Sequence, residues 1–325
     1  MRSRGAPPAR RAQTVVVLGW LALAWPGCGG EEASEDVSES AGHAGTGGLL
    51  TWAVAESPGE LDPLLARSRV DQLVTRQIHE PLIESLDGPF GDVRRRPGLA
   101  LSVHGSADAT IWRLRLRSGV RFQDGTRFNA GAVMANGERW RTTRQGRALM
   151  PDLFALDAPR PGLVRFFLEA PDPGFPERLA SPRAGIVSPR ALSPRDGEGA
   201  ELVRDERTGT GPFELREHDP PGALVARNLE WWGSARGLGP ALDQVEFPVV
   251  AGASDRLDRL AAGELEVADQ LGAAEAVEAR RDPLLEVFGG GAAGALAIER
   301  SVRGITSAVA VPSLSEVWVT RVAAD

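Results

Sequence analysis

Residues 112–140 read WRLRLRSGVRFQDGTRFNAGAVMANGERW. Apolar and basic side chains alternate from Ile111 to Arg117, which predicts a half-exposed strand of an antiparallel pair. The side chains expected to face away from the core on this strand are Arg113, Arg115 and Arg117. Asp124-Gly125 then predicts a turn, and Asn129 predicts the cap of a helix that runs to Trp140.

The sequence on either side predicts further strands and two more helices. Short apolar runs predict strands at residues 49–55, 163–168, 223–227, 245–250 and 265–268. Ser68 is expected to cap one helix, and a second helix begins at Ser254 and ends at Gly263. The apolar face predicted for the first helix carries Val70, Leu73, Val74 and Ile78. Strands and helices mixed in this way indicate an α/β chain with antiparallel pieces.

The composition excludes several classes of function. The chain has 325 residues, a formal net charge of -7 and no basic run outside its N-terminus, so a nucleic-acid partner is not expected. It contains no lysine, which excludes a lysine-dependent phosphate loop and Schiff-base chemistry. The four histidines lack metal-binding spacing, and a single cysteine allows no internal disulfide. We therefore predict no catalytic residue, no metal site and no cofactor.

The N-terminus has the layout of an export signal. Arginines precede an apolar run from Val15 to Trp25, which is short for a membrane span. A small residue directly before Cys28 resembles the lipobox of bacterial lipoproteins, in which the cysteine is lipidated. We predict a signal peptide at residues 1–27, and a lipidated Cys28 that begins a disordered tether over residues 28–48. Ordinary signal-peptide cleavage with an incidental thiol is the alternative.

Four separated segments carry a resemblance to a known family. They include the loop ESPGELDP after the first predicted strand, the strand–turn–helix stretch quoted above, and GTGPF at residues 209–213. In order along the chain, the segments are residues 50–88, 112–140, 209–233, and 242–250 with 257–269. Together they resemble family 5 of the solute-binding proteins of ABC importers, which bind peptides, nickel complexes and some sugars.

The resemblance implies a fold. It predicts a lobe of the class II periplasmic-binding-protein type, with a mixed sheet, an inserted α+β sub-domain, and a second lobe that is absent or rudimentary. Lobe I is expected to comprise residues 49–88 and 206–325, and the inserted sub-domain residues 89–205. After Asp269 the family's second-lobe motifs are not found, and residues 289–291 (GGG) are expected to form a flexible junction. Residues 310–322, which include Trp318, resemble the family's closing strand.

The resemblance also implies candidate ligand contacts. The loop after the first strand faces the ligand cleft in the family, which makes Glu56 and Ser57 candidates. Glu56 suits a cationic amine, and a solvated carboxylate is the alternative. Thr208 and Thr210 match the segment that crosses between sub-domains, and the glycines beside them are expected to serve backbone geometry. Trp231 and Trp232 are expected to be packing residues, with ligand stacking as the alternative.

The function implied is binding rather than catalysis. The chain is expected to be an exported, monomeric lipoprotein at the outer face of the cytoplasmic membrane or in the periplasm. It would capture peptides or similar small solutes and deliver them to ABC permease subunits, with hinge closure around the ligand. The alternative is a surface lipoprotein or interaction module, derived from a solute-binding protein, whose ligand binding has degraded.

Overall fold

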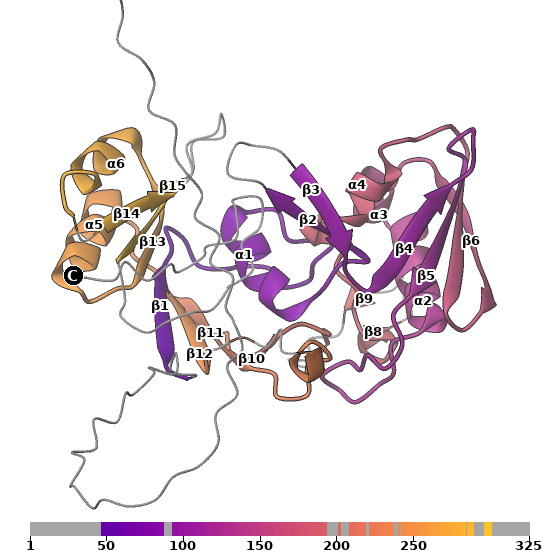
Figure 1. Cartoon of the computed structure of the whole chain (residues 1–325), viewed down its shortest axis with the longest axis horizontal. Helices are drawn as coiled ribbons and strands as arrows, with labels where there is room; N and C mark the ends of the chain where they lie inside the picture. Colours follow the sequence, from indigo (N-terminus) through magenta and orange to yellow (C-terminus); the bar gives the residue numbers. More distant parts are fainter. Residues whose placement is uncertain are drawn as a thin grey trace, which may run out of the picture. The chain divides into compact units, whose positions relative to one another are not determined.

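The computed structural model describes residues 47–87, 93–193, 201–202, 208–218, 221–236, 240, 242–283, 285–288 and 296–300. The largest sheet in this part of the chain has seven strands (Figure 1). In spatial order they are β10 (Phe213–Glu217), β11 (Gly222–Arg227), β12 (Gln244–Pro248), β1 (Leu49–Ala53), β13 (Val267–Leu271), β15 (Leu296–Arg300) and β14 (Leu285–Phe288).

The centre of this sheet is parallel and its flanks are antiparallel. β1 pairs in parallel with β12 on one side, where Leu50 lies opposite Val245, and with β13 on the other, where Trp52 lies opposite Val267. The carboxyl ends of β12, β1 and β13 therefore meet at one edge of the sheet. β10 is antiparallel to β11, and β11 to β12, so β10 runs in the same direction as the three central strands. The mixed sheet predicted from the sequence is confirmed.

Two helices cover opposite faces of the sheet. Leu50 and Trp52 of β1 pack with α1 (Arg69–Ile78), whereas Ala53 packs with α5 (Ala253–Ala262). Successive side chains of a strand point to opposite faces, so α1 and α5 lie on different sides of β1. The chain therefore leaves β1 toward one face and leaves the neighbouring β12 toward the other.

Local sequence explains where α1 begins. The Ser68 hydroxyl accepts from the Asp71 backbone N–H, and the Asp71 carboxylate accepts from the Ser68 N–H, which makes a reciprocal capping box. The four apolar residues predicted for its inner face are all buried in one cluster with β1, β10, β11 and β12. The predicted cap and apolar face of this helix are confirmed.

A second core is formed by Leu64 and by apolar residues between positions 82 and 186. Its four-stranded antiparallel sheet runs in the order β4 (Ala100–Gly105), β5 (Ile111–Leu116), β7 (Leu163–Leu168) and β6 (Leu153–Arg160). α2 (Ala130–Thr142) packs on β6 and β7, and Trp140 of this helix stacks on Phe166 at 6.5 Å between ring centroids. Asn129 caps α2 as predicted, since its side-chain oxygen accepts from the Gly131 N–H at 2.8 Å.

The remaining elements of the described chain are short. The helices are α3 (Arg144–Leu149), α4 (Phe175–Leu179) and α6 (Ala273–Ala279), with 3₁₀ turns η1 (Pro182–Ala184), η2 (Pro189–Ala191) and η3 (Ser234–Arg236). The strands are β2 (Ile83–Asp87), β3 (Val93–Pro97), β8 (Leu192–Ser193) and β9 (Glu201–Leu202), which pair as β2-β3 and β8-β9. The division of the chain at 88/89 and 205/206 stays a prediction.

One predicted orientation is wrong. The alternation from Ile111 places Arg117 among the solvent-facing arginines, but Arg117 is only 6% exposed. β5 ends at Leu116, and the Arg117 backbone N–H donates instead to the carbonyl of Leu99. Once the strand has ended, the alternation no longer fixes the side-chain direction, and the guanidinium folds over the ring of Trp232 at 4.0 Å.

Other predictions differ in extent or fall outside the described residues. The strand predicted at 265–268 forms later, at Val267–Leu271, because Gly263 ends α5 in the left-handed conformation and three residues follow before the strand. The lipidated Cys28, the tether to residue 46, the glycine run at 289–291 and the closing strand with Trp318 lie outside the described part of the chain.

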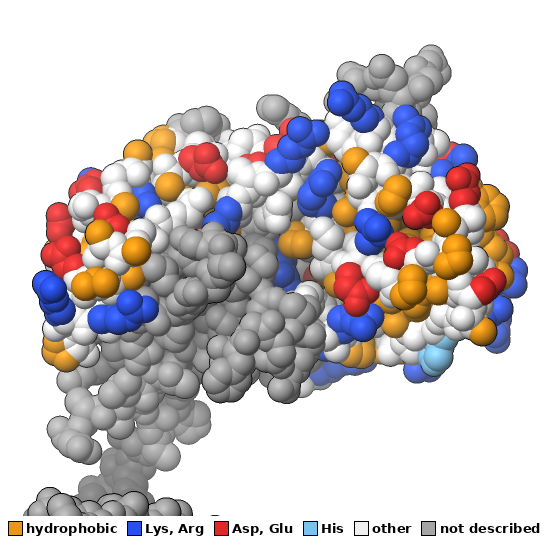
Figure 2. All heavy atoms as spheres, turned by 90° about the horizontal axis from the view of Figure 1, so that it is seen from above, with side chains coloured by type: hydrophobic (Ala, Val, Ile, Leu, Met, Phe, Trp, Pro, Cys, Tyr) orange, Lys and Arg blue, Asp and Glu red, His pale blue; other side chains and the backbone are white. Residues whose placement is uncertain are grey.

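The surface of the described chain carries both signs of charge. Acidic and basic side chains are interspersed on the face shown in Figure 2. Among the residues that the structure describes, no helix is both long enough and apolar enough to cross a bilayer.

Candidate functional site

The carboxyl edge of the central strands is the candidate site. We use this name for residues 54–57 after β1, 250–252 after β12 and 269–272 at the end of β13. The exits of β1 and β12 turn to opposite faces of the sheet, as described above. Ligands of open α/β sheets bind beyond the carboxyl ends of neighbouring strands whose exits diverge in this way.

The loop after β1 offers polar groups at this edge. Glu56 is exposed and Ser57 is half-buried. The Ser57 hydroxyl is shielded from solvent and has no hydrogen-bond partner among the described residues, so a ligand would reach it only if this loop moved. Ala55 donates its backbone N–H to the side-chain oxygen of Gln270 at 3.4 Å, which connects this loop to the end of β13.

A buried ion pair anchors the end of β13. The side chain of Asp269 is 0% exposed and accepts a forked hydrogen bond from Arg69. The Arg69 Nε–Asp269 Oδ2 and Arg69 Nη2–Asp269 Oδ1 distances are 3.1 and 2.9 Å. Arg69 is the first residue of α1, where the helix dipole disfavours a cation, so the carboxylate stabilises that helix start as well.

Arg256 of α5 holds two strand ends together. Its Nε donates to the carbonyl of Asp269 at 2.9 Å and its Nη2 to the carbonyl of Gln270 at 2.9 Å. Its Nη1 donates to the carbonyls of Val250 and Ala251. The guanidinium is 2% exposed, so it satisfies carbonyls at the ends of β12 and β13 that water does not reach.

Gln270 has a strained backbone at this edge. Its φ is +55°, in the left-handed region that non-glycine residues seldom adopt. The Asp269 carboxylate accepts from its N–H at 2.8 Å, and Arg256 binds its carbonyl, so the conformation is fixed from both sides. Strain held by the surrounding structure is common where a side chain must point in an unusual direction at a functional site.

The structure does not bring the four predicted contacts together. Thr208 and Thr210 precede β10, which runs parallel to β1, so they lie toward the amino ends of the strands. Both are buried, at 3% and 0% exposure, and the Thr208 hydroxyl pairs with His79 Nε2 at 2.7 Å. A ligand contact through either hydroxyl would need a rearrangement of this segment, whereas Glu56 is accessible as it stands.

The segment after Thr208 packs closely on the end of α1. A Cβ added to Gly209 would lie 1.9 Å from the carbonyl oxygen of Ile78, and one on Gly211 would lie 2.6 Å from it. The Gly211 N–H donates to that same carbonyl at 2.8 Å. Only glycine permits this approach, which agrees with the expected backbone role of these residues.

Two buried titratable groups follow α1. Burial lowers the pKa of His79 to about 4, so the imidazole is neutral near pH 7. Burial raises the pKa of Glu80 to about 8, and hydrogen bonds from Trp232 and Trp231 partly oppose that rise. The two indole N–H groups donate to separate carboxyl oxygens of Glu80, at 2.8 Å from Trp232 and 3.3 Å from Trp231. The Thr210 side chain also lowers the pKa of Glu80, although its hydroxyl does not form a hydrogen bond of normal geometry with the carboxyl group.

The sequence analysis missed most of the residues that shape the carboxyl edge. In the sequence, Asp269 is an acid after a short apolar run, and Arg69 and Arg256 are single cations within predicted helices, so no local pattern marks their contacts. The described residues contain no cluster of three or more histidine, cysteine or acidic side chains placed to hold a metal ion.

Comparison with known proteins decides the family. The model of the bacterial extracellular solute-binding proteins, family 5, matches residues 94–309. The chain belongs to this family. The match continues past Asp269, where the recognisable motifs ended, and takes in the region of α6, β14 and β15. The members of this family are bacterial extracellular solute-binding proteins.

The chain is similar to known proteins over only part of their length. The glutathione-binding protein GsiB of Escherichia coli O6:K15:H31 (strain 536 / UPEC) is 30% identical over 220 residues, which are 66% of this chain and 41% of that protein. An ABC transporter substrate-binding protein from Sinorhizobium meliloti superposes with a TM-score of 0.64 at 25% identity, over 74% of this chain and 48% of that one. DppA from Helicobacter pylori, solved with the peptide STSA, shares the fold with a TM-score of 0.61 at 21% identity, over 75% of this chain and 51% of that one. The chain thus spans about half the length of the proteins it matches or less.

The buried ion pair at the carboxyl edge predicts a large stability difference. Arg69→Ala leaves the Asp269 carboxylate buried without its partner, which should lower the free energy of unfolding by about 3–5 kcal/mol. Arg259→Ala is the matched control, because its ion pair with Asp255 is about half exposed on both sides and should contribute less than about 1 kcal/mol. Urea denaturation of both variants checks this, and equal losses would contradict the assigned role of Asp269.

Glu80 predicts a pH dependence of stability. In the folded chain Glu80 keeps its proton up to about pH 8, whereas in the unfolded chain Glu80 releases it near pH 4.5. The free energy of unfolding therefore falls as pH rises between these values. His79 acts oppositely below pH 6.5, where only the unfolded chain takes up its proton. Between pH 6.5 and 8, Glu80→Gln should therefore become more stable relative to wild type by about 1.4 kcal/mol per pH unit. Thermal unfolding over this range checks it, with the exposed Glu264→Gln as control; parallel profiles for wild type and Glu80→Gln would refute it.

Proposed function

We propose that this chain is the ligand-capturing component of an ABC importer and binds peptides or similar small solutes at the carboxyl edge. The observation that carries the proposal is that β1 and the neighbouring β12 end at the same edge and exit toward opposite faces of the sheet, and that Glu56, just after β1, is exposed there. Membership of the solute-binding family and the relatives that bind glutathione or peptides support the same class of ligand.

Glu56 gives the proposed site its preference for charge. The nearest acid of the described edge, Asp269, is neutralised by Arg69. An exposed carboxylate next to a neutralised, buried one can attract the amino group of a peptide without competition from an adjacent anion. Glutathione and short peptides with a free amino terminus both carry that group, whereas an acetylated peptide does not.

The chain is held at the membrane in this proposal. Residues 1–27 direct export, lipidated Cys28 anchors the protein, and residues 28–48 link the anchor to the folded body. A binding protein kept close to its permease meets it at a raised effective concentration. Delivery to permease subunits from a monomeric, tethered protein completes the transport function.

The anchor makes a direct prediction for Cys28. The full chain, expressed in a Gram-negative bacterium with radiolabelled palmitate, should incorporate the label and sediment with membranes. Cys28→Ser should do neither, because the chain then offers no thiol for acylation. An unlabelled, soluble wild-type protein would favour the alternative of ordinary signal-peptide cleavage with an incidental thiol.

The ligand site makes a prediction for Glu56. Isothermal titration of the purified full chain with a set of short peptides and glutathione should show saturable binding. Glu56→Gln should weaken binding of ligands with a free amino group by about tenfold or more, the usual loss when a charged hydrogen bond is removed. N-acetylated peptides should bind wild type and Glu56→Gln alike.

Glu264→Gln is the matched control for this measurement. Glu264 is also exposed, but it precedes β13 and so lies at the opposite edge of the sheet. Its substitution removes the same charge and should leave binding unchanged. A folded chain that binds none of these ligands would overturn peptide capture and favour the interaction-module alternative.

A further inference from the structure

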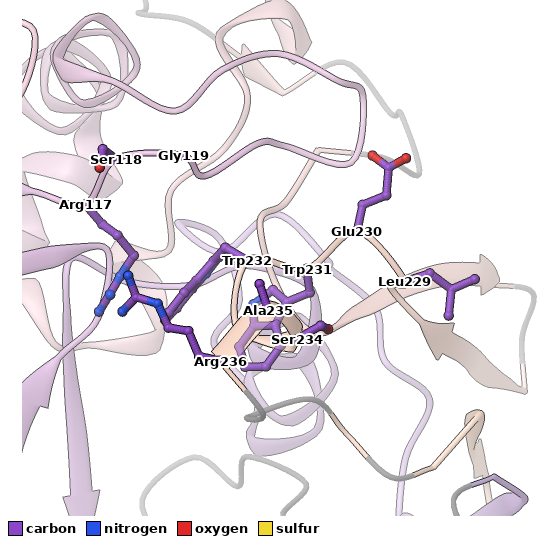
Figure 3. A pocket seen from close by; sticks show the side chains of 10 residues that line it. All are labelled: Arg117, Ser118, Gly119, Leu229, Glu230, Trp231, Trp232, Ser234, Ala235 and Arg236. Carbon is purple, nitrogen blue, oxygen red and sulfur yellow. The ribbon is translucent and has the colours of Figure 1, made fainter.

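A pocket lies at the opposite end of the sheet from the carboxyl edge. It has a volume of about 430 Å³ and is lined by residues 117–119, 229–232 and 234–236 (Figure 3). These lining residues follow β5 and β11. The backbone N–H of Arg227, at the end of β11, donates to the carbonyl of Asp243. The backbone N–H of Asp243 donates in turn to the carbonyl of Gly48, just before β1. The segment after β11 therefore departs from the amino ends of β1 and β12, away from Glu56.

Two arginines share one indole in this pocket. The guanidinium carbons of Arg117 and Arg236 lie 4.0 and 5.5 Å from the ring centroid of Trp232. Figure 3 shows both guanidinium groups gathered on the same side of that ring. Two cations brought together in this way repel each other. Burial lowers the pKa of Arg117 most, and the charge of Arg236 lowers it next. The charges of Glu80 and Glu84 raise this pKa, each by less than Arg236 lowers it.

The arginine pair lacks a compensating anion. Neither guanidinium forms an ion pair with any residue that the structure describes. Arg117 is 6% exposed, and its Nε donates to the carbonyl of Gly98 at 3.1 Å, but its Nη1 has no acceptor. A buried charged donor without an acceptor is costly and rare in folded proteins.

The nearby carboxyl groups do not fill this role. Glu80 accepts from both indoles, and Glu84 pairs with Arg96 at 2.5 Å. Figure 3 shows the Glu230 carboxylate directed away from the guanidinium groups. The arginine pair is therefore open to an anion from outside the described chain.

The second indole provides a flat apolar wall. The rings of Trp231 and Trp232 lie 5.2 Å apart at 54°. Both are fixed in place because their N–H groups donate to the same buried carboxyl of Glu80. Fixed aromatic faces beside guanidinium groups suit a planar ligand, which can stack on the indole while its anionic end meets the cations.

We propose that this pocket is a second binding site, which takes a carboxylate attached to a flat, apolar body. The carboxylate lies against the guanidinium groups of Arg117 and Arg236, while the body packs on Trp231. Guanidinium and carboxylate groups are complementary forks, and pairing them removes the repulsion between the two arginines. The exposed hydroxyls of Ser118 and Ser234, on the same walls, add hydrogen-bond donors for the carboxylate.

Two sources carry this chemistry, a free aromatic acid and the C-terminus of a peptide that ends in an aromatic residue. Isothermal titration of the full chain with benzoate, and with N-acetyl-Gly-Phe, whose amino terminus is blocked, tests each source. Benzamide and N-acetyl-Gly-Phe amide are the uncharged counterparts. We expect saturable binding of at least one acid, and at least about tenfold weaker binding of its amide.

Substitutions test whether the acid binds at this pocket. Arg236→Gln changes an exposed side chain, so the fold should persist, and it should weaken binding of the acid by about tenfold. Arg259→Gln, which removes the same charge from α5, and Glu56→Gln at the carboxyl edge should leave it unchanged. The Glu56 variant separates this site from the proposed peptide site, so that either can fail alone. No saturable binding of either acid, equal binding of acid and amide, or full binding by Arg236→Gln would overturn the proposal.

Discussion

A buried carboxylate paired with one arginine determines the geometry of the candidate site. Asp269 is removed from water at the end of β13, and an isolated charge in that position would be strongly destabilising. The forked contact with Arg69 offsets this penalty and fixes the first residue of α1 against the sheet. Arg256 adds the second constraint, since its guanidinium binds carbonyls from the ends of both β12 and β13. Together they hold the ends of the strands beside which Glu56 lies.

The two ends of the same sheet differ in chemistry. The carboxyl edge presents an exposed acid, Glu56, beside an ion pair that is already neutral, which suits a ligand with an amino group. The amino end presents Arg117 and Arg236, neither of which forms an ion pair with a described acid, and suits a ligand with a carboxylate. A sheet that places opposite charges at opposite ends can bind two chemically different groups without their competing. The carboxyl edge is where family membership leads one to expect a solute; the pocket at the amino end follows from the side chains alone.

Local patterns in the sequence predicted the local structure well. The caps at Ser68 and Asn129 and the strand at 163–168 depend on residues within a few positions of each other, and the structure has all three. The error at Arg117 shows the limit of such patterns. Its direction is set by the ring of Trp232, a contact across the chain that periodicity does not encode. Thr208 and Thr210 were matched by motif, but the direction of β10 places them at the other end of the sheet from Glu56.

The residues that shape the site were the hardest to predict for the same reason. Asp269 and Arg69 are 200 positions apart in the sequence, and each alone resembles an ordinary surface charge. The left-handed backbone of Gln270 has no sequence signal, because it is imposed by Arg256 and the Asp269 carboxylate rather than by a glycine. Hydrogen bonds between residues far apart in the sequence, rather than local secondary-structure propensity, determine the conformation of the carboxyl edge.

Hydrogen–deuterium exchange of the full chain, with and without saturating glutathione, tests the central claim most directly. If the ligand binds at the carboxyl edge, the amides of residues 54–57, 250–252 and 269–272 should become protected. Residues 229–236 at the amino end should exchange at the same rate in both states. Protection confined to the amino end, or no change at the carboxyl edge when ligand is bound, would contradict the account.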